Sequence, residues 1–197
     1  MKILKINKKN FKKVVKTILR LIKEGKVVVC PTDTVYGLIC DAVNKKAVAK
    51  VFKIKKRESK KPLPIFVKDL KMANKFAKIN KRQKTFLKSV WPGRVTAVLE
   101  RKKTKIKLYG IAKKTIALRI PKYELLLSLA KQLNRPLTGT SANISGKPAS
   151  TKIQEVVSQF NGQRYQPDLI IDADNLKPSK PSTVIDLTDK KLKILRK

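Results

Sequence analysis

Two kinds of apolar pattern alternate along most of this sequence. One is a short run of β-branched residues, as in residues 26–30, which is typical of a buried strand. The other repeats apolar residues at helical spacing, as in residues 11–22, and ends where Gly25 follows. This alternation predicts an α/β fold in which helices flank a twisted mixed sheet.

The alternation continues almost to the end of the chain. Further helices are expected at residues 45–56, 70–77, 81–90, 123–133 and 151–160. Further strands are expected at 63–67, 95–99, 116–120, 137–140, 169–172, 183–187 and 193–195. No internal repeat, low-complexity linker or break in composition divides the sequence, so we expect one domain over residues 1–197.

The length and hydropathy of the chain exclude several classes of protein. With 197 residues, 42% of them hydrophobic, the chain can bury a core without disulfide or metal staples. No segment reaches the length of a transmembrane helix. The first six residues lack the continuous apolar stretch of a secretory signal. We therefore expect a cytoplasmic protein with no membrane contact.

The cysteine and histidine content narrows the chemistry. The sequence has two cysteines, Cys30 and Cys40, and no histidine. Histidine-based triads and histidine-containing zinc sites are therefore excluded, and two thiolates cannot complete a tetrahedral metal site within one chain. Both cysteines lie in apolar runs and are expected to be small core residues, so we expect no metal site.

The charge balance is strongly basic. Lys and Arg total 49 against 13 Asp and Glu, which gives a net charge of +36. Such a chain attracts polyanions, so a basic RNA- or tRNA-binding module is one interpretation. Forty of the 49 cations are lysine, spread evenly, whereas arginine is the better residue for bidentate phosphate recognition. A general lysine bias explains the charge equally well.

Three polar loops could carry chemistry, and each also has a purely structural interpretation. Residues 31–38 (PTDTVYGL) follow a buried strand and would equally suit a turn closed by threonine hydroxyls. Residues 55–63 crowd five cations, which suits either a phosphate clamp or a solvated helix end. Residues 138–146 (TGTSANISG) offer hydroxyls and backbone N–H groups for an anion, or form an ordinary strand-to-helix turn.

The order and spacing of these loops resemble the TsaC/YrdC family of threonylcarbamoyl-AMP synthases. The resemblance runs from about residue 25 to residue 187. The motifs that carry it are Pro31 to Leu38, Lys55 and Arg57, Trp91-Pro92-Gly93, Ala117-Leu118-Arg119, Ser141 and Asn143, and Ser182-Thr183. It implies a twisted α/β sheet around a concave basic cavity.

The resemblance also implies an activity. Such enzymes condense L-threonine, bicarbonate and ATP to threonylcarbamoyl-AMP and release pyrophosphate, with Mg²⁺ accompanying the ATP. Partner proteins then transfer the threonylcarbamoyl group to the adenosine next to the anticodon of tRNAs that read codons starting with A. No covalent enzyme intermediate is needed, so positioning and charge stabilisation, chiefly by Lys55 and Arg57, would carry the catalysis.

Roles follow from the resemblance residue by residue. The expected contacts to L-threonine are Thr34, Arg119, Gly139 and Ser182. The expected contacts to the nucleotide are Lys55, Arg57, Lys61, Thr115, Ser141, Asn143 and Arg196. Asp33 and Tyr36 are expected only to shape the first loop.

Three departures from the family pattern stand out. Phe66 occupies a position where many longer relatives carry a histidine near the threonine. Arg94 follows Trp91-Pro92-Gly93 where proline is common. The chain ends at Lys197, like the short single-domain form.

A relative acting in carbamoyl transfer for hydrogenase maturation fits less well, because zinc-binding cysteine motifs are absent from the sequence.

Overall fold

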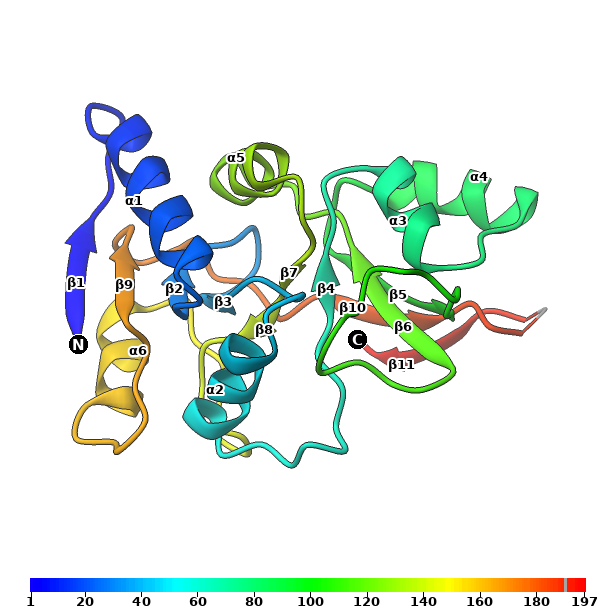
Figure 1. The fold of residues 1–197 in the computed structure, drawn as a ribbon. Helices are drawn as coiled ribbons and strands as arrows, with labels where there is room; N and C mark the ends of the chain where they lie inside the picture. Colours follow the sequence, from blue (N-terminus) through cyan, green and yellow to red (C-terminus); the bar gives the residue numbers. More distant parts are fainter. Residues whose placement is uncertain (190) are drawn as a thin grey trace.

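The computed structural model describes residues 1–189 and 191–197 (Figure 1). The helices in these residues are α1 (Phe11–Lys23), α2 (Lys45–Lys55), α3 (Leu70–Phe76), α4 (Lys81–Val90), α5 (Glu124–Leu133) and α6 (Ile153–Phe160). The strands are β1 (Lys2–Lys5), β2 (Val28–Cys30), β3 (Gly37–Ile39), β4 (Ile65–Phe66), β5 (Val95–Glu100), β6 (Thr115–Arg119), β7 (Leu137–Thr138), β8 (Thr140–Ser141), β9 (Leu169–Asp172), β10 (Thr183–Asp186) and β11 (Lys193–Arg196). The predicted α/β class is confirmed.

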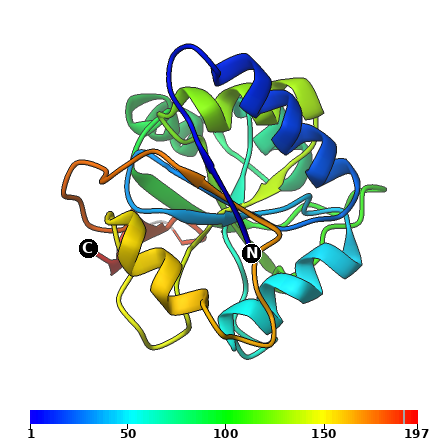
Figure 2. The ribbon, with the colours of Figure 1, turned by 90° about the vertical axis from the view of Figure 1, so that its left-hand side faces the viewer.

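The first sheet has the strand order β1-β9-β2-β3-β8 and is mixed, because β2 pairs parallel with β9 and antiparallel with β3. Its three inner strands β9, β2 and β3 are short, mostly apolar runs that are largely buried, as the sequence pattern requires. Figure 2 shows α1 and α5 on one face and α2 and α6 on the other. Two apolar clusters fill these two layers, one containing Ile18 and Leu129 and the other Val51 and Phe160.

The second sheet has the order β11-β10-β5-β6-β4-β7 and is also mixed. Side chains alternate across it with period two. Ala97, Leu99, Ile116 and Leu118 face α3 and α4 and form the third apolar cluster. The opposite side of β5 and β6 presents residues such as Thr96 and Arg119, and this side faces the cavity described below.

The two sheets meet at Gly139, and here the sequence-based expectation of one strand over residues 137–140 is wrong. Leu137 and Thr138 pair with β4 of the second sheet, whereas Thr140 and Ser141 pair with β3 of the first. Between them the Gly139 N–H donates to the Pro64 carbonyl, 2.8 Å away. The single expected sheet is therefore divided in two, and one short segment belongs to both.

Two strands were not predicted. β1 lies at an edge of the first sheet and pairs parallel with β9. Its four residues are two apolar residues between two lysines, which is too short a pattern to identify a strand. β3 begins at Gly37, inside the segment expected to be a loop, because that segment turns back antiparallel to β2. The other predicted helices and strands are present, with ends shifted by a few residues.

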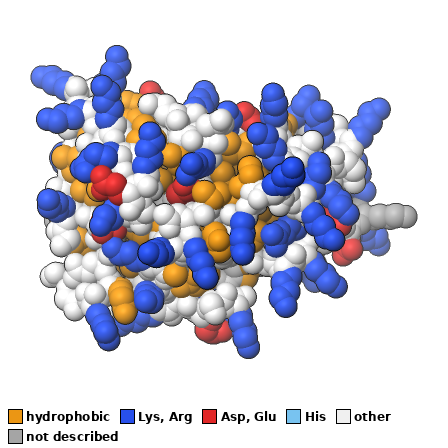
Figure 3. Space-filling model, viewed as in Figure 1, with side chains coloured by type: hydrophobic (Ala, Val, Ile, Leu, Met, Phe, Trp, Pro, Cys, Tyr) orange, Lys and Arg blue, Asp and Glu red, His pale blue; other side chains and the backbone are white. Residues whose placement is uncertain are grey.

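Cationic side chains are spread over the face shown in Figure 3, above both sheets, and are not gathered into one patch. This distribution matches the even spacing of lysine in the sequence. Within residues 1–189 and 191–197, no helix has both the length and the apolarity needed to cross a membrane.

Candidate functional site

A cavity of about 440 Å³ lies between the two sheets. The second sheet supplies one wall through residues of β4, β5, β6 and β10, and the segments 32–37 and 139–141 supply the other. Its charged lining residues within the described chain are all cations: Arg57, Lys60, Lys61, Arg119 and Arg196. Eight of the expected site residues line it: Thr34, Arg57, Lys61, Arg119, Gly139, Ser141, Ser182 and Arg196.

The loop after β2 is closed by its own threonine hydroxyls. The hydroxyl of Thr32 accepts the N–H of Thr34 at 3.0 Å and donates to the carbonyl of Val35 at 2.7 Å. The hydroxyls of Thr32 and Thr34 are also 3.0 Å apart. The turn interpretation of this segment is therefore correct, and the turn places the buried Thr34 against the cavity.

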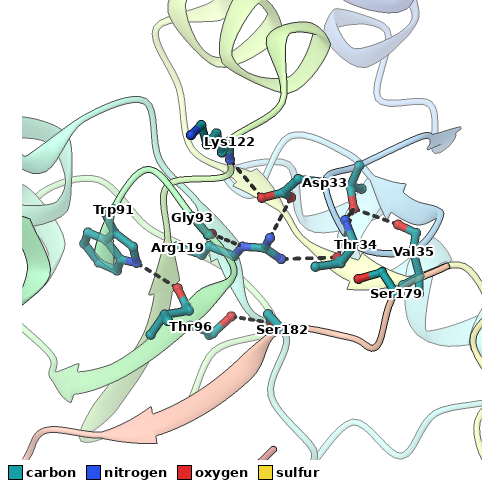
Figure 4. A network of polar contacts seen from close by, with 12 residues as sticks. Asp33, Thr34, Val35, Trp91, Gly93, Thr96, Arg119, Lys122, Ser179 and Ser182 are labelled. Carbon is teal, nitrogen blue, oxygen red and sulfur yellow. Dashed lines mark hydrogen bonds and ion pairs between the residues drawn. The ribbon is translucent and has the colours of Figure 1, made fainter. Parts of the chain in front are cut away.

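Arg119, the last residue of β6, reaches from the second sheet to this loop (Figure 4). Its Nη2 lies 2.6 Å from a carboxylate oxygen of Asp33, and its Nε donates to the carbonyl of Gly93 at 2.9 Å. Its Nη1 makes a long 3.5 Å contact with the hydroxyl of Thr34. Burial lowers the pKa of the Arg119 guanidinium, and the carboxylate of Asp33 partly offsets this effect.

Asp33 was expected only to shape its turn, but it also fixes the arginine. Its second carboxylate oxygen accepts the N–H of Lys122 at 2.9 Å, just after β6. Tyr36 ties the loop to a different segment, since its hydroxyl donates to the carbonyl of Asp174 at 2.6 Å. Asp33 is one of 13 carboxylates in a chain with 49 cations. This scarcity of carboxylates was the available sequence signal that Asp33 could be the partner of a cation.

Ser182 and Arg196 lie together in the lining of the cavity, and Ser182 lies on the side of Arg119 that faces away from Asp33 (Figure 4). The hydroxyl of Ser182 is 2.9 Å from that of Thr96 on β5. Arg196, on the edge strand β11, donates through Nη2 to the Ser182 carbonyl at 2.7 Å. Burial lowers the pKa of Arg196, and the nearby charge of Arg57 lowers it further. The pairing of β11 with β10 therefore brings the last arginine of the chain beside Arg57.

Hydrogen bonds from the Arg57 side chain hold the segment that follows α2. Arg57 donates through Nε to the Lys61 carbonyl at 2.9 Å and through Nη2 to the Pro62 carbonyl at 3.1 Å. These bonds curl the segment so that Arg57, Lys60 and Lys61 all line the cavity. The resulting cluster is suited to bind an anion such as a phosphate chain.

Three expected nucleotide contacts do not line this cavity. Lys55 and Asn143 are buried and border a smaller depression of about 230 Å³, which shares Arg57, Lys61 and Ser141 with the cavity. Thr115 lies on the same face of β6 as Ala117 and Arg119, further along the strand.

Phe66 and Gly139 form a tight contact in the wall of the cavity. A Cβ atom on Gly139 would lie 2.5 Å from the ring of Phe66, so only glycine fits there without displacing the ring. The guanidinium carbon of Arg119 lies 5.7 Å from the centre of the same ring. Phe66 therefore packs beside both Gly139 and Arg119 in the wall of the cavity.

Arg94 has a visible role in the backbone near the site. Its carbonyl accepts the N–H of Thr183 at 3.0 Å, which joins β5 to β10 beside Ser182. Its charge also lowers the pKa of Arg119. Nothing in the structure explains why this position is arginine and not proline.

The described residues contain no group of three or more His, Cys, Asp or Glu side chains able to hold a metal ion. Cys30 and Cys40 are both buried and unpaired by disulfide, as expected for core residues. Burial raises the pKa of the Cys40 thiol to about 12, so this thiol stays protonated at neutral pH.

These features define a mixed α/β protein whose two sheets enclose a cation-lined cavity. The model of the Sua5/YciO/YrdC family, described as telomere recombination, matches residues 20–197. A Methanocaldococcus jannaschii protein provisionally named threonylcarbamoyl-AMP synthase is 38% identical over 195 residues, which cover 99% of this chain and 90% of that protein. The chain therefore belongs to the Sua5/YciO/YrdC family.

Of two further relatives, one is much longer than this chain and one is of similar length. The threonylcarbamoyl-AMP synthase of Pyrococcus abyssi is 37% identical over 85% of this chain, which spans 49% of that protein. The solved structure of P. abyssi Sua5 complexed with L-threonine has a TM-score of 0.86 at 33% identity, over 99% of this chain and 56% of that one. The structure of E. coli YciO has a TM-score of 0.84 at 25% identity, over 100% of this chain and 94% of that one.

Proposed function

We propose that this protein is a threonylcarbamoyl-AMP synthase that uses L-threonine, bicarbonate and ATP. One observation carries the proposal: Thr34 and Arg119 border the same cavity as Arg57 and Lys61, so an amino acid and a nucleotide could lie side by side there. The names of the relatives in P. abyssi and M. jannaschii, and the complex of P. abyssi Sua5 with L-threonine, support the same activity.

The reaction forms two bonds in sequence. The threonine amine attacks bicarbonate, water leaves, and a carbamate results. A carbamate oxygen then attacks the α-phosphorus of ATP, and the bond to the bridging oxygen breaks to release pyrophosphate. We expect Arg119, with the hydroxyls of Thr34 and Ser182 and the backbone of Gly139, to orient the amino acid. Holding the reactants in line can lower such a barrier by about 7–11 kcal/mol in favourable cases.

The cationic residues would stabilise the charge that builds up on the phosphates. We assign this role to Arg57 and Lys61, with Arg196 beside them, and place the nucleotide also against Ser141, Asn143 and Thr115. We identify the space between the sheets with the concave basic cavity of the family. Because no carboxylate lines it within the described residues, Mg²⁺ would be held by ATP oxygens and water, not by the protein.

We further propose that residues 1–197 act as one domain in the cytoplasm, where ATP and tRNA are available. The product is a mixed anhydride, so another molecule must accept its threonylcarbamoyl group. We infer that tRNA-modifying partner proteins transfer its threonylcarbamoyl group to tRNA.

Threonine-dependent pyrophosphate release tests the proposal. Purified protein with ATP, Mg²⁺, bicarbonate and L-threonine should release pyrophosphate, and a reaction without threonine is the control. Arg57→Ala should abolish the release while circular dichroism stays unchanged, whereas Lys46→Ala, on the exposed side of α2, should retain it. Release that is the same with and without threonine would disprove the proposal.

A further inference from the structure

Lys55 is the last residue of α2, and it is only 2% exposed. Its Nζ lies 2.6 Å from the carbonyl oxygen of Ser141 and 2.8 Å from that of Asn143. A third oxygen, Oδ1 of Asn143, lies 2.9 Å away. The carbonyl of Lys55 in turn accepts the N–H of Ser145 at 2.7 Å. One residue therefore holds the loop 141–145 through both its side chain and its backbone.

The loop is shaped to receive this ammonium group. The Ser141 hydroxyl donates to Oδ1 of Asn143 at 2.6 Å. The side-chain nitrogen Nδ2 of Asn143 donates to the carbonyls of Ile144 and Lys147 at 3.0 and 2.6 Å. These bonds orient the Asn143 amide so that its oxygen faces Lys55. All three protons of the ammonium group thus have a protein oxygen as partner.

Among residues 1–189 and 191–197, the charge of Lys55 has no carboxylate partner. Its three acceptors are neutral, and the charged residues beside it in the small depression are Lys56, Arg57, Glu58 and Lys61. The carboxylate of Glu58 is already paired with Lys61 at 2.8 Å. Burial lowers the pKa of Lys55 to about 7, and Arg57 acts in the same direction. The three oxygens around Nζ can only accept hydrogen bonds, so they favour the protonated form of Lys55.

We propose that Lys55 is a positioning residue of the nucleotide site, and not a direct phosphate ligand. Its ammonium group holds residues 141–145 in the conformation that presents Ser141 and Asn143 to the nucleotide. The ATP phosphates then supply the negative charge that Lys55 lacks in the free protein. This inference rests on the proposed function for the identity of the ligand, but the state of the loop in the free protein does not depend on it.

Amide hydrogen exchange of the free protein tests the first part. Lys55→Met should accelerate exchange of the amides in residues 141–147 by at least tenfold. Arg57→Met, at an expected phosphate contact, and Lys46→Met, at an exposed position on α2, should leave these amides unchanged. Equal exchange in Lys55→Met and the unmodified protein would overturn the inference.

A second variant keeps the test decisive where Lys55→Met does not fold. Lys55→Gln retains an N–H donor without the charge, and it should exchange the amides of residues 141–147 faster than the unmodified protein does. Unchanged exchange in Lys55→Gln counts against the inference in the same way.

Kinetics test the second part. Lys55→Met should raise KM for ATP more than tenfold and change KM for L-threonine less than threefold, since the loop presents groups to the nucleotide. An equal rise in both constants would contradict a role specific to the nucleotide site. Absence of threonine-dependent pyrophosphate release in the unmodified protein would instead refute the proposed function, and the exchange result would still stand.

Discussion

The guanidinium of Arg119 and the carboxylate of Asp33 form an ion pair of 2.6 Å between the two sheets, with side chains only 3% and 6% exposed. Two of the guanidinium nitrogens are occupied by Asp33 and the Gly93 carbonyl. Within the part of the chain that the structure describes, the third nitrogen, Nη1, has only the long contact with Thr34. This nitrogen is therefore the one that could receive the carboxylate of an amino acid in the cavity.

Removing Asp33 should destabilise the protein. Asp33→Ala leaves a buried guanidinium without its partner, which typically costs about 3–5 kcal/mol of the free energy of unfolding. Urea denaturation measures the change. Glu58→Ala, which breaks an exposed ion pair with Lys61, is the matched control and should unfold almost like the unmodified protein. A loss in Asp33→Ala no larger than in this control would show that the pair does not hold the sheets together.

Gly139→Ala should disturb both stability and activity. The added methyl group would displace the ring of Phe66, and overpacking of this kind costs about 1–3 kcal/mol. Because the ring lies beside Arg119, KM for L-threonine should rise as well. Adding Phe66→Leu to Gly139→Ala should restore part of both losses, as seen in urea denaturation and in threonine titrations. No recovery in the double variant would mean that the clash with the ring is not the cause.

ATP affinity should fall as the pH rises above 7. Burial brings the pKa of Lys55 to about 7, so the free protein loses this proton at higher pH. ATP phosphates favour the ammonium form and raise its pKa, so binding above pH 7 must take up a proton. The dissociation constant should then grow by up to about tenfold per pH unit, as linkage requires for one proton.

Calorimetric titration of ATP between pH 6.5 and 9 measures this effect. Buffers of different ionisation enthalpy report the proton uptake directly. In Lys55→Met the uptake should be lost and the pH dependence should flatten. A steep profile that persists in this variant would assign the titration to another group.

RNA binding, where it occurs, should be dominated by the phosphate backbone. The chain has a net charge of +36, and on the face shown in Figure 3 the cationic side chains are spread out and do not form one patch. Affinity for tRNA should therefore fall by about 10³–10⁵ between 50 and 200 mM salt, as expected for 6–10 phosphate contacts. Filter binding with tRNA and an unrelated RNA of equal length measures both affinities. Tight binding of tRNA alone at 200 mM salt would identify a specific tRNA site.

Local patterns predicted most of the secondary structure but not how the strands are shared between sheets. The helical spacing in residues 11–22 and the apolar run in 169–172 each identify an element, because side-chain periodicity is a local property. The expected strand at 137–140 was divided because Gly139 bonds to Pro64, far away in sequence. No local pattern contains that contact.

The sequence by itself determined the α/β class, the family motifs and the residues expected to border the cavity, since each depends on residue type and spacing. Only the tertiary structure decided what these residues contact. It pairs Arg119 with Asp33 and directs Lys55 to the loop at Ser141 and Asn143. The physical reason is that a buried charge must find its partners among groups that the fold brings together, and these lie 86 to 88 residues apart in the chain.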